Sequence, residues 1–142
     1  MARPKLAQEI MTTGITTLES GAKLLHAVLL MRTGGFRHLP VVKDGCPVGV
    51  VSDRDVQRAS PSRFSNLSPD EYNQLFETTP IEKVMAEEPG IVTPETPIHE
   101  VVQLMCEQKF GSVLVVDGEN KLVGIVTTTD LLGVLHDLLG AS

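Results

Sequence analysis

One short block of residues whose side chains could bind a ligand occurs twice in the chain. It reads Gly-apolar-apolar-Ser/Thr-x-x-Asp, and its copies span residues 49–55 and 124–130. Each copy predicts a strand that runs into a helix, with a glycine that allows another group to approach the backbone closely. The hydroxyl can cap the helix and face an anion at its positive end. The aspartate can accept two hydrogen bonds from a vicinal diol such as ribose.

A purely structural role would explain the same residues. Ser52 and Thr127 would then be ordinary N-caps, and Asp55 and Asp130 would be acids in a first helical turn. Because the whole block occurs at the same place in two repeats, the sequence favours ligand binding over capping alone.

The block belongs to an internal repeat. Residues 14–19 match 90–95, residues 36–42 match 110–116 and residues 48–55 match 123–130, at offsets of 76, 74 and 75. Hydrophobic periodicity and turn residues predict the same elements in both copies. These are a short helix (6–11 and 80–85), an extended segment through Ile15 or Ile91, an amphipathic helix (22–33 and 97–108), two strands (39–42 with 48–51, and 113–116 with 122–126) and a last helix from near Asp53 or Thr128.

The repeats define the domain organisation. The first repeat is expected at residues 1–59, a polar connector at 60–79 and the second repeat at 80–142. One repeat carries a small sheet that it cannot bury alone, whereas two repeats packed together can. In the connector, Ser68 and Glu71 predict a capping box that opens a short helix through Phe76.

Composition excludes several classes of function. The 142 residues carry a net charge of −6 and very few aromatic side chains, which argues against a nucleic-acid binder. Cys46 and Cys106 belong to no metal or redox motif, and we expect both to be reduced thiols in the cytoplasm. Neither a secretory signal nor a membrane span is expected.

No catalytic or metal-binding pattern is present in the sequence. The four histidines lack metal-ligand spacing, and there is no nucleophile elbow, Walker loop or dinucleotide fingerprint. We therefore expect no enzyme activity and no catalytic cofactor.

Taken together, these motifs resemble a tandem pair of cystathionine-β-synthase-type (CBS) domains, also called a Bateman module. The resemblance covers about residues 5–139 and rests on both blocks, on residues 37–42, and on Met11 and Met85, which lead into Gly14 and Gly90. It implies an α+β fold in which two pseudo-twofold-related βαββα repeats pack through their small sheets and leave two clefts.

The resemblance also implies the ligand and its contacts. AMP, ADP and ATP are the leading candidates, and NAD(H) and S-adenosylmethionine are further ones. Each cleft would combine the block of one repeat with the extended segment and first hairpin strand of the other. One cleft would use Ser52 and Asp55 with Ile91, Thr93 and Val113. The other would use Thr127 and Asp130 with Ile15, Thr17, Arg37, His38 and Pro40, and Val50 and Ile125 would pack against adenine.

The two clefts are expected to differ. The second copy has Gly111 and Ser112 where the first has Arg37 and His38. Arginine can bind phosphate through two parallel hydrogen bonds, and a protonated histidine adds a second positive charge. We therefore expect the cleft at Thr127 and Asp130 to bind a phosphorylated ligand more strongly. The alternative is that Arg54, inside the first block, and Arg58, one helical turn further on, supply compensating positive charge to the other cleft.

These features predict a stand-alone energy-sensing regulatory module that acts on a separate protein. The wide apolar face of the last helix predicts a homodimer. The alternative is an interaction or scaffold domain whose clefts are vestigial. A third reading, a nucleotide hydrolase, is not supported, because the sequence offers no candidate nucleophile or metal site for it.

Overall fold

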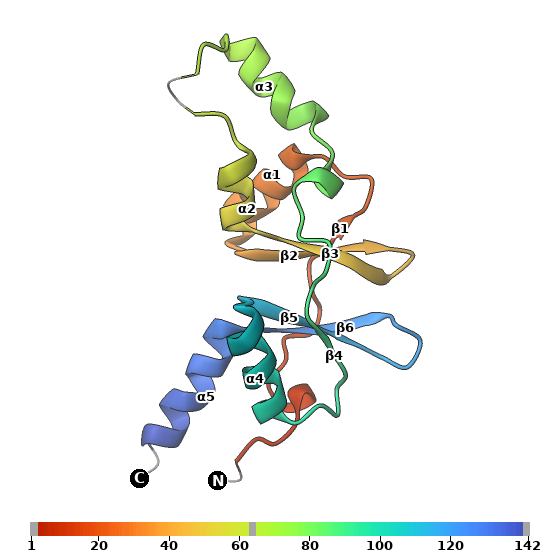
Figure 1. Ribbon diagram of the computed structural model, residues 1–142, viewed down its shortest axis with the longest axis vertical. Coiled ribbons are helices and arrows are strands. Elements are labelled where there is room, and N and C mark those ends of the chain that lie inside the picture. Colours follow the sequence, from red (N-terminus) through yellow and green to blue (C-terminus); the bar gives the residue numbers. More distant parts are fainter. Residues whose placement is uncertain (1–2, 63–64, 141–142) are drawn as a thin grey trace. The chain divides into compact units, whose positions relative to one another are not determined.

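The computed structural model describes residues 3–62 and 65–140 (Figure 1). The outermost ends of the two predicted repeats and residues 63 and 64 of the predicted connector lie outside the described residues. The elements are η1 (Ala7–Glu9), β1 (Leu18–Glu19), α1 (Leu24–Gly34), β2 (His38–Lys43), β3 (Cys46–Ser52), α2 (Asp53–Ala59), α3 (Pro69–Thr78), η2 (Ile81–Lys83), β4 (Ile91–Val92), α4 (Ile98–Gln108), β5 (Ser112–Val116), β6 (Leu122–Thr127) and α5 (Thr128–Gly140).

The order of elements confirms the predicted α+β class with two βαββα repeats. The predicted short helices at 6–11 and 80–85 are only single 3-10 turns, η1 and η2, because so few residues cannot offset the cost of starting an α-helix. The connector helix is confirmed as α3, which contacts α1. The twofold axis and the packing of the two sheets on each other stay predictions.

The chain folds into two compact units that do not follow the sequence repeats. One unit is the continuous segment from Thr16 to Glu88 and holds the sheet β1-β2-β3. The other joins the N-terminal segment, through Ile15, to the chain from Pro89 onward and holds the sheet β4-β5-β6. Thus η1 belongs to the unit of the second repeat and η2 to the unit of the first.

Each sheet pairs a short parallel strand with an antiparallel hairpin, and its register corrects the sequence alignment. Leu18 pairs with Val41, and Val92 pairs with Val115. Leu18 and Val92 are therefore equivalent at an offset of 74, the offset that also relates Val41 to Val115. The match of residues 14–19 with 90–95 was wrong by two residues, because strand pairing makes Thr17, and not Ile15, the equivalent of Ile91.

The segments that carry Met85 and Met11 attach to the third strand of each sheet. In one unit, Val50 and Ala86 exchange backbone hydrogen bonds of 3.1 and 2.9 Å. In the other unit, Thr12 and Ile125 do the same at 2.9 and 3.0 Å. Each sheet edge is thereby paired by backbone that lies far away in the sequence.

The glycine of each block is explained by these methionines. A Cβ at Gly49 would lie 2.8 Å from the carbonyl oxygen of Ala86 and 2.5 Å from Sδ of Met85. A Cβ at Gly124 would overlap Sδ of Met11. The predicted close approach to the glycine is confirmed, and the approaching group is a methionine of the same unit.

The core of each unit lies between its sheet and its helices. Figure 1 shows α1 and α2 on one side of β1-β2-β3, and α4 and α5 on one side of β4-β5-β6. Alternate strand residues face these helices, as the period of two in a strand requires. The buried clusters are Leu18, Ala27, Leu39, Val41, Val51 and Ile81 in one unit, and Ala7, Val92, Val101, Met105, Val113, Val115 and Val126 in the other.

Replacing Gly49 by alanine should lower the free energy of unfolding by about 1–3 kcal/mol, because the added methyl group overpacks a backbone carbonyl that cannot turn aside. Urea unfolding measures this change. Gly118→Ala is the matched control, since Gly118 is exposed and nothing lies near its added Cβ. We expect that control to stay within about 0.5 kcal/mol of wild type. Equal losses in both variants would contradict the packing role of Gly49.

Candidate functional site

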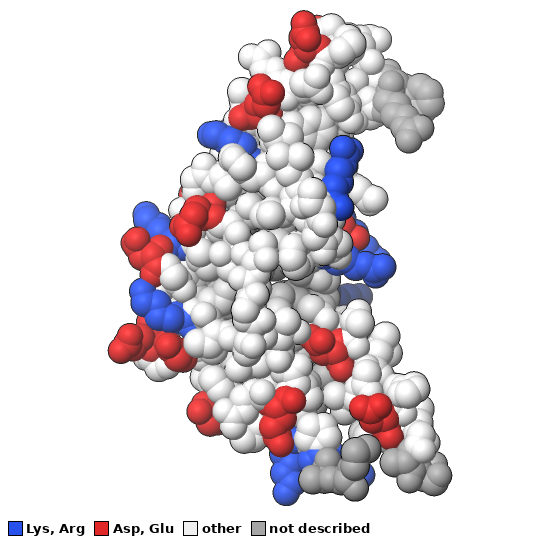
Figure 2. All heavy atoms as spheres, turned by 180° about the vertical axis from the view of Figure 1, so that it is seen from behind, with Lys and Arg blue, Asp and Glu red and all other residues white. Residues whose placement is uncertain are grey.

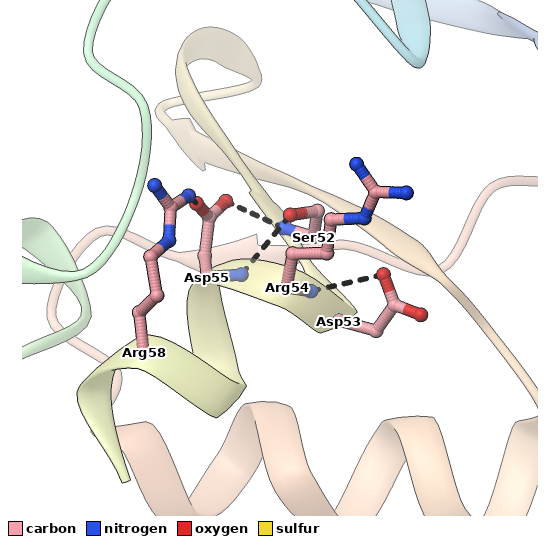
Figure 3. A network of polar contacts seen from close by, with 5 residues as sticks. All are labelled: Ser52, Asp53, Arg54, Asp55 and Arg58. Carbon is pink, nitrogen blue, oxygen red and sulfur yellow. Dashed lines mark hydrogen bonds and ion pairs between the residues drawn. The ribbon is translucent and has the colours of Figure 1, made fainter.

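The first block ends in a reciprocal cap at the start of α2. The Ser52 N–H donates to Oδ2 of Asp55 at 2.8 Å, and the Asp55 N–H donates to Oγ of Ser52 at 3.2 Å (Figure 3). The other carboxylate oxygen of Asp55, Oδ1, accepts from Nη2 of Arg58 at 2.5 Å. Both oxygens of this carboxylate therefore have protein partners.

The second block forms a similar cap at the start of α5. Oδ2 of Asp130 accepts from the Thr127 N–H at 2.8 Å and from Oγ1 of Thr127 at 3.1 Å. The Asp130 N–H donates to Oγ1 of Thr127 at 3.3 Å. Among residues 3–62 and 65–140, no hydrogen bond or ion pair reaches Oδ1 of Asp130. This oxygen can accept a hydrogen bond without displacing a neighbour.

The capping role is thus confirmed in both copies, and it leaves room for a ligand. A carboxylate oxygen has two lone pairs, and the cap uses Oδ2 of each aspartate. The ribose role of Asp55 and Asp130 stays a prediction. The two sites already differ, because Arg58 holds Oδ1 of Asp55.

Arg37 and His38 lie next to the first block. His38 pairs with Ser52 across the hairpin, and the Asp53 N–H donates to the carbonyl of Arg37 at 3.0 Å. In the other unit, Ser112 pairs with Thr127, and Gly111 accepts from Thr128 at 3.1 Å. The predicted correspondence of Arg37 and His38 with Gly111 and Ser112 is confirmed.

The expected positive charge on His38 is not supported. Burial lowers the pKa of His38 below its ordinary value of 6.5, and the nearby charge of Arg37 lowers it further. The carboxylates of Asp53 and Asp55 raise that pKa, but less than burial lowers it. The imidazole is therefore neutral at pH 7, and Arg37 remains the cation of this segment.

Two predicted contacts are buried in this structure. The side chain of Val113 has no exposed surface and belongs to the core cluster of its unit. Hairpin pairing makes Val113 the equivalent of Leu39, which is also a core residue. Pro40 is also fully buried. The burial of Val113 argues against a ligand contact there, because the period of two in the strand turns its side chain into the core, and the predicted contact stays untested.

The remaining predicted residues divide between the two units, and their joint use in one cleft stays a prediction. One unit contains Thr17, Arg37, His38, Pro40, Val50, Ser52 and Asp55. The other contains Ile15, Ile91, Thr93, Val113, Ile125, Thr127 and Asp130. Arg37, Ile91 and Thr93 are exposed, whereas Ile125 is buried.

The sequence analysis named Arg58 as a cation near the first block but missed its ion pair with Asp55. Arg58 follows it by three residues, a spacing that brings two side chains together on a helix. That spacing was the available signal. Across the described parts of the chain, no three His, Cys, Asp or Glu side chains gather to hold a metal ion. Nor is any helix there long and apolar enough to cross a membrane.

Comparison with known families decides the classification. The family model of the CBS domain matches the chain twice, at residues 7–62 and 81–137. The chain belongs to the CBS domain family. Because the two matches follow each other in one chain, it is a tandem CBS pair, as the resemblance implied.

Curated proteins that match this pair differ in how much of their own length the match covers. A CBS domain-containing protein of Dictyostelium discoideum is 27% identical, over 94% of this chain and 93% of its own length. A homoserine O-acetyltransferase of Methanococcoides burtonii is 28% identical, but the match covers only 22% of that protein against 87% of this CBS pair.

Two solved structures share the fold of the CBS pair. The cytosolic domain of the Mg²⁺ channel MgtE in complex with ATP is 27% identical with a TM-score of 0.71, covering 92% of this chain and 48% of that one. The structure of CBSX2 in complex with AMP has a TM-score of 0.76 at 24% identity, covering 95% of this chain and 98% of that one.

Replacing His38 by glutamine should flatten the pH dependence of stability on the acid side. The folded-state pKa of His38 lies below the unfolded value, so the unfolded chain binds more protons as the pH falls through about 6.5. Stability is therefore lost on acidification, and the variant should lose less between about pH 7.5 and pH 5.5. Urea unfolding at several pH values measures this, with exposed His99→Gln as the control. Equal flattening by both variants would contradict the buried, neutral state of His38.

Proposed function

We propose that this CBS pair is a regulatory module that binds an adenine nucleotide at each Ser/Thr-x-x-Asp block and signals its presence to a protein partner. One observation carries the proposal. Asp55 and Asp130 stand at equivalent positions at the starts of α2 and α5, each fixed through Oδ2 to the backbone N–H three residues earlier. A carboxylate held in place before binding loses little freedom when it accepts a ribose diol.

The known complexes support the choice of ligand. The MgtE domain, 27% identical to this chain, was solved with ATP, and CBSX2 was solved with AMP. Both ligands contain an adenosine and a phosphate. AMP, ADP and ATP are therefore the first ligands to test, followed by NAD(H) and S-adenosylmethionine.

The proposed contacts are those that the family resemblance implies. Asp55 and Asp130 accept the ribose, and Val50 and Ile125 pack against adenine. Ile91 and Thr93 line the ligand at Asp55. Ile15 and Thr17 line the ligand at Asp130, where Arg37 binds phosphate. His38 contributes a neutral ring in this proposal, and Val113 no longer takes part.

The proposed module senses nucleotides in the cytoplasm and carries out no reaction on them. On the face drawn in Figure 2, Lys and Arg side chains are scattered among Asp and Glu. With a net charge of −6, this distribution supports a small-molecule or protein partner over a nucleic acid. Calorimetry that finds no affinity for any adenosine compound would favour a scaffold role.

A second copy of the chain is the proposed cover for α5. Leu132, Leu135 and Leu139 are 58%, 49% and 68% exposed, and their spacing places them in one stripe of the helix. Burying such a stripe against its own copy removes apolar surface from water.

Light scattering should therefore give a dimer of the 15.3 kDa chain at tens of micromolar. The double variant Leu132→Glu with Leu139→Glu should be monomeric, because its charges would be buried at the interface. Leu29→Glu is the matched control and should remain dimeric, because Leu29 is a similarly exposed leucine on a different helix, α1. A monomeric wild type would refute the dimer.

Asp130→Ala and Asp55→Ala should each weaken nucleotide binding at one site. A hydrogen bond to a charged carboxylate contributes about 1.5–3 kcal/mol, or roughly ten- to more than a hundredfold in affinity. Calorimetry with AMP and ATP measures the loss. Because these aspartates also cap helices, a control for lost capping is required.

Glu71→Ala supplies that control. Glu71 and Ser68 form the same reciprocal cap at the start of α3, outside the proposed sites. Its removal should cost about 0.5–2 kcal/mol of stability and leave nucleotide affinity unchanged. A similar loss of affinity in Glu71→Ala and Asp130→Ala would refute the ribose role.

A further inference from the structure

We infer that Arg58 makes the site at Asp55 selective for phosphorylated adenosine ligands over uncharged ones, and that the site at Asp130 lacks this control. The inference rests on the proposed function and assigns to one residue a specificity that the two repeats do not share. It follows from the partners of the two aspartates.

Both oxygens of the Asp55 carboxylate have a protein partner before any ligand arrives. Oδ2 accepts from the Ser52 N–H at 2.8 Å, and Oδ1 pairs with Nη2 of Arg58 at 2.5 Å (Figure 3). A ribose hydroxyl that binds Oδ1 must therefore displace the guanidinium or share this oxygen with it, and either event weakens the ion pair.

The exposure of the two side chains indicates which of them moves. Arg58 is 77% exposed, whereas Asp55 is 13% exposed and fixed by the cap. An exposed arginine can leave its partner and remain solvated, whereas moving the carboxylate would break the start of the helix. Arg58 is thus the group that yields to a ligand.

The site at Asp130 has no corresponding cation. The residue three positions after Asp130 is Gly133, where Arg58 follows Asp55. In the described part of the chain, Oδ1 of Asp130 has no hydrogen-bond or ion-pair partner. A ribose diol reaches this oxygen without breaking an ion pair.

Displacing Arg58 has different consequences for charged and uncharged ligands. Breaking an exposed ion pair lowers the affinity of the site for adenosine by about two- to fivefold, because adenosine carries no charge that could compensate. In AMP the phosphate is attached to the same ribose, within the roughly 8–10 Å over which the freed cation acts through salt solution. The attraction between the two offsets the loss, so the site at Asp55 favours AMP over adenosine.

Calorimetry of the full chain with adenosine and with AMP tests the inference. The Asp130→Asn background isolates the site at Asp55. In that background, Arg58→Gln should raise the affinity for adenosine by about two- to fivefold and lower the ratio of AMP to adenosine affinity.

Arg54→Gln is the matched control for net charge. Arg54 lies in the same helix, and Figure 3 shows its guanidinium pointing away from Asp55. Its removal changes the net charge by the same amount and leaves the ion pair intact. Adenosine affinity should therefore not rise in this variant.

The reciprocal variant moves the control to the other site. Gly133 is exposed, and nothing lies within 4 Å of a Cβ added there, so the backbone can carry a side chain at this position in Gly133→Arg. In the Asp55→Asn background it should lower adenosine affinity by about two- to fivefold and raise the AMP to adenosine ratio.

The outcomes separate the inference from the proposed function. A wild-type chain that binds neither ligand overturns both. If the chain binds AMP but Arg58→Gln leaves the ratio unchanged, or changes it no more than Arg54→Gln does, nucleotide binding stands and the role of Arg58 is refuted.

Discussion

Each unit is organised around a glycine in its third strand, over which a methionine from a distant segment packs. The backbone pairs of Val50 with Ala86, and of Thr12 with Ile125, hold that segment on the strand. The same strand continues into the capped start of α2 or α5. Because a few residues separate the packed glycine from the aspartate, the position of each carboxylate depends on how firmly its strand is held. Core packing and the candidate site therefore share one short stretch of chain.

The two aspartates show how one side chain can serve both the fold and a ligand. Oδ2 of each is committed to a backbone N–H, which satisfies a donor that a helix start would otherwise leave unpaired. Oδ1 is the oxygen that differs: Arg58 holds it in one unit, and no described residue holds it in the other. The repeats are thus equivalent in the part that stabilises the helix and unequal in the part that would face a ligand. Two repeats can therefore stay alike in how the aspartate caps its helix and still differ in how the aspartate could contact a ligand.

Local patterns in the sequence were sufficient for most of the elements, since period, turn residues and caps are read within a few residues. The helix α3 and both hairpins are examples. Features set by distant contacts could not be predicted in this way. Strand pairing makes Leu18 equivalent to Val92, which the match of residue types in 14–19 and 90–95 did not predict. The core position of Val113 is likewise set by contacts within the folded unit. The neutral state of His38 depends on burial, which a motif does not reveal. For the candidate site, the sequence pointed to both aspartates and to Arg58 as a nearby cation, but not to the ion pair that Arg58 forms with Asp55.

The division of the chain into one continuous and one interrupted unit constrains the order of folding. The unit from Thr16 to Glu88 contains all of its own strands and helices, so it can be complete as soon as those residues have left the ribosome. The segment with η1 has no sheet to pair with at that stage, since β4, β5 and β6 are still to be synthesised. Ile10 and Met11 pack against core residues that begin at Val92, more than eighty residues away. Closing so long a loop carries an entropic cost. Once the continuous unit has folded, its residues no longer form a flexible loop. The two parts of the interrupted unit are then joined by a shorter flexible chain, and the entropic cost of bringing them together falls.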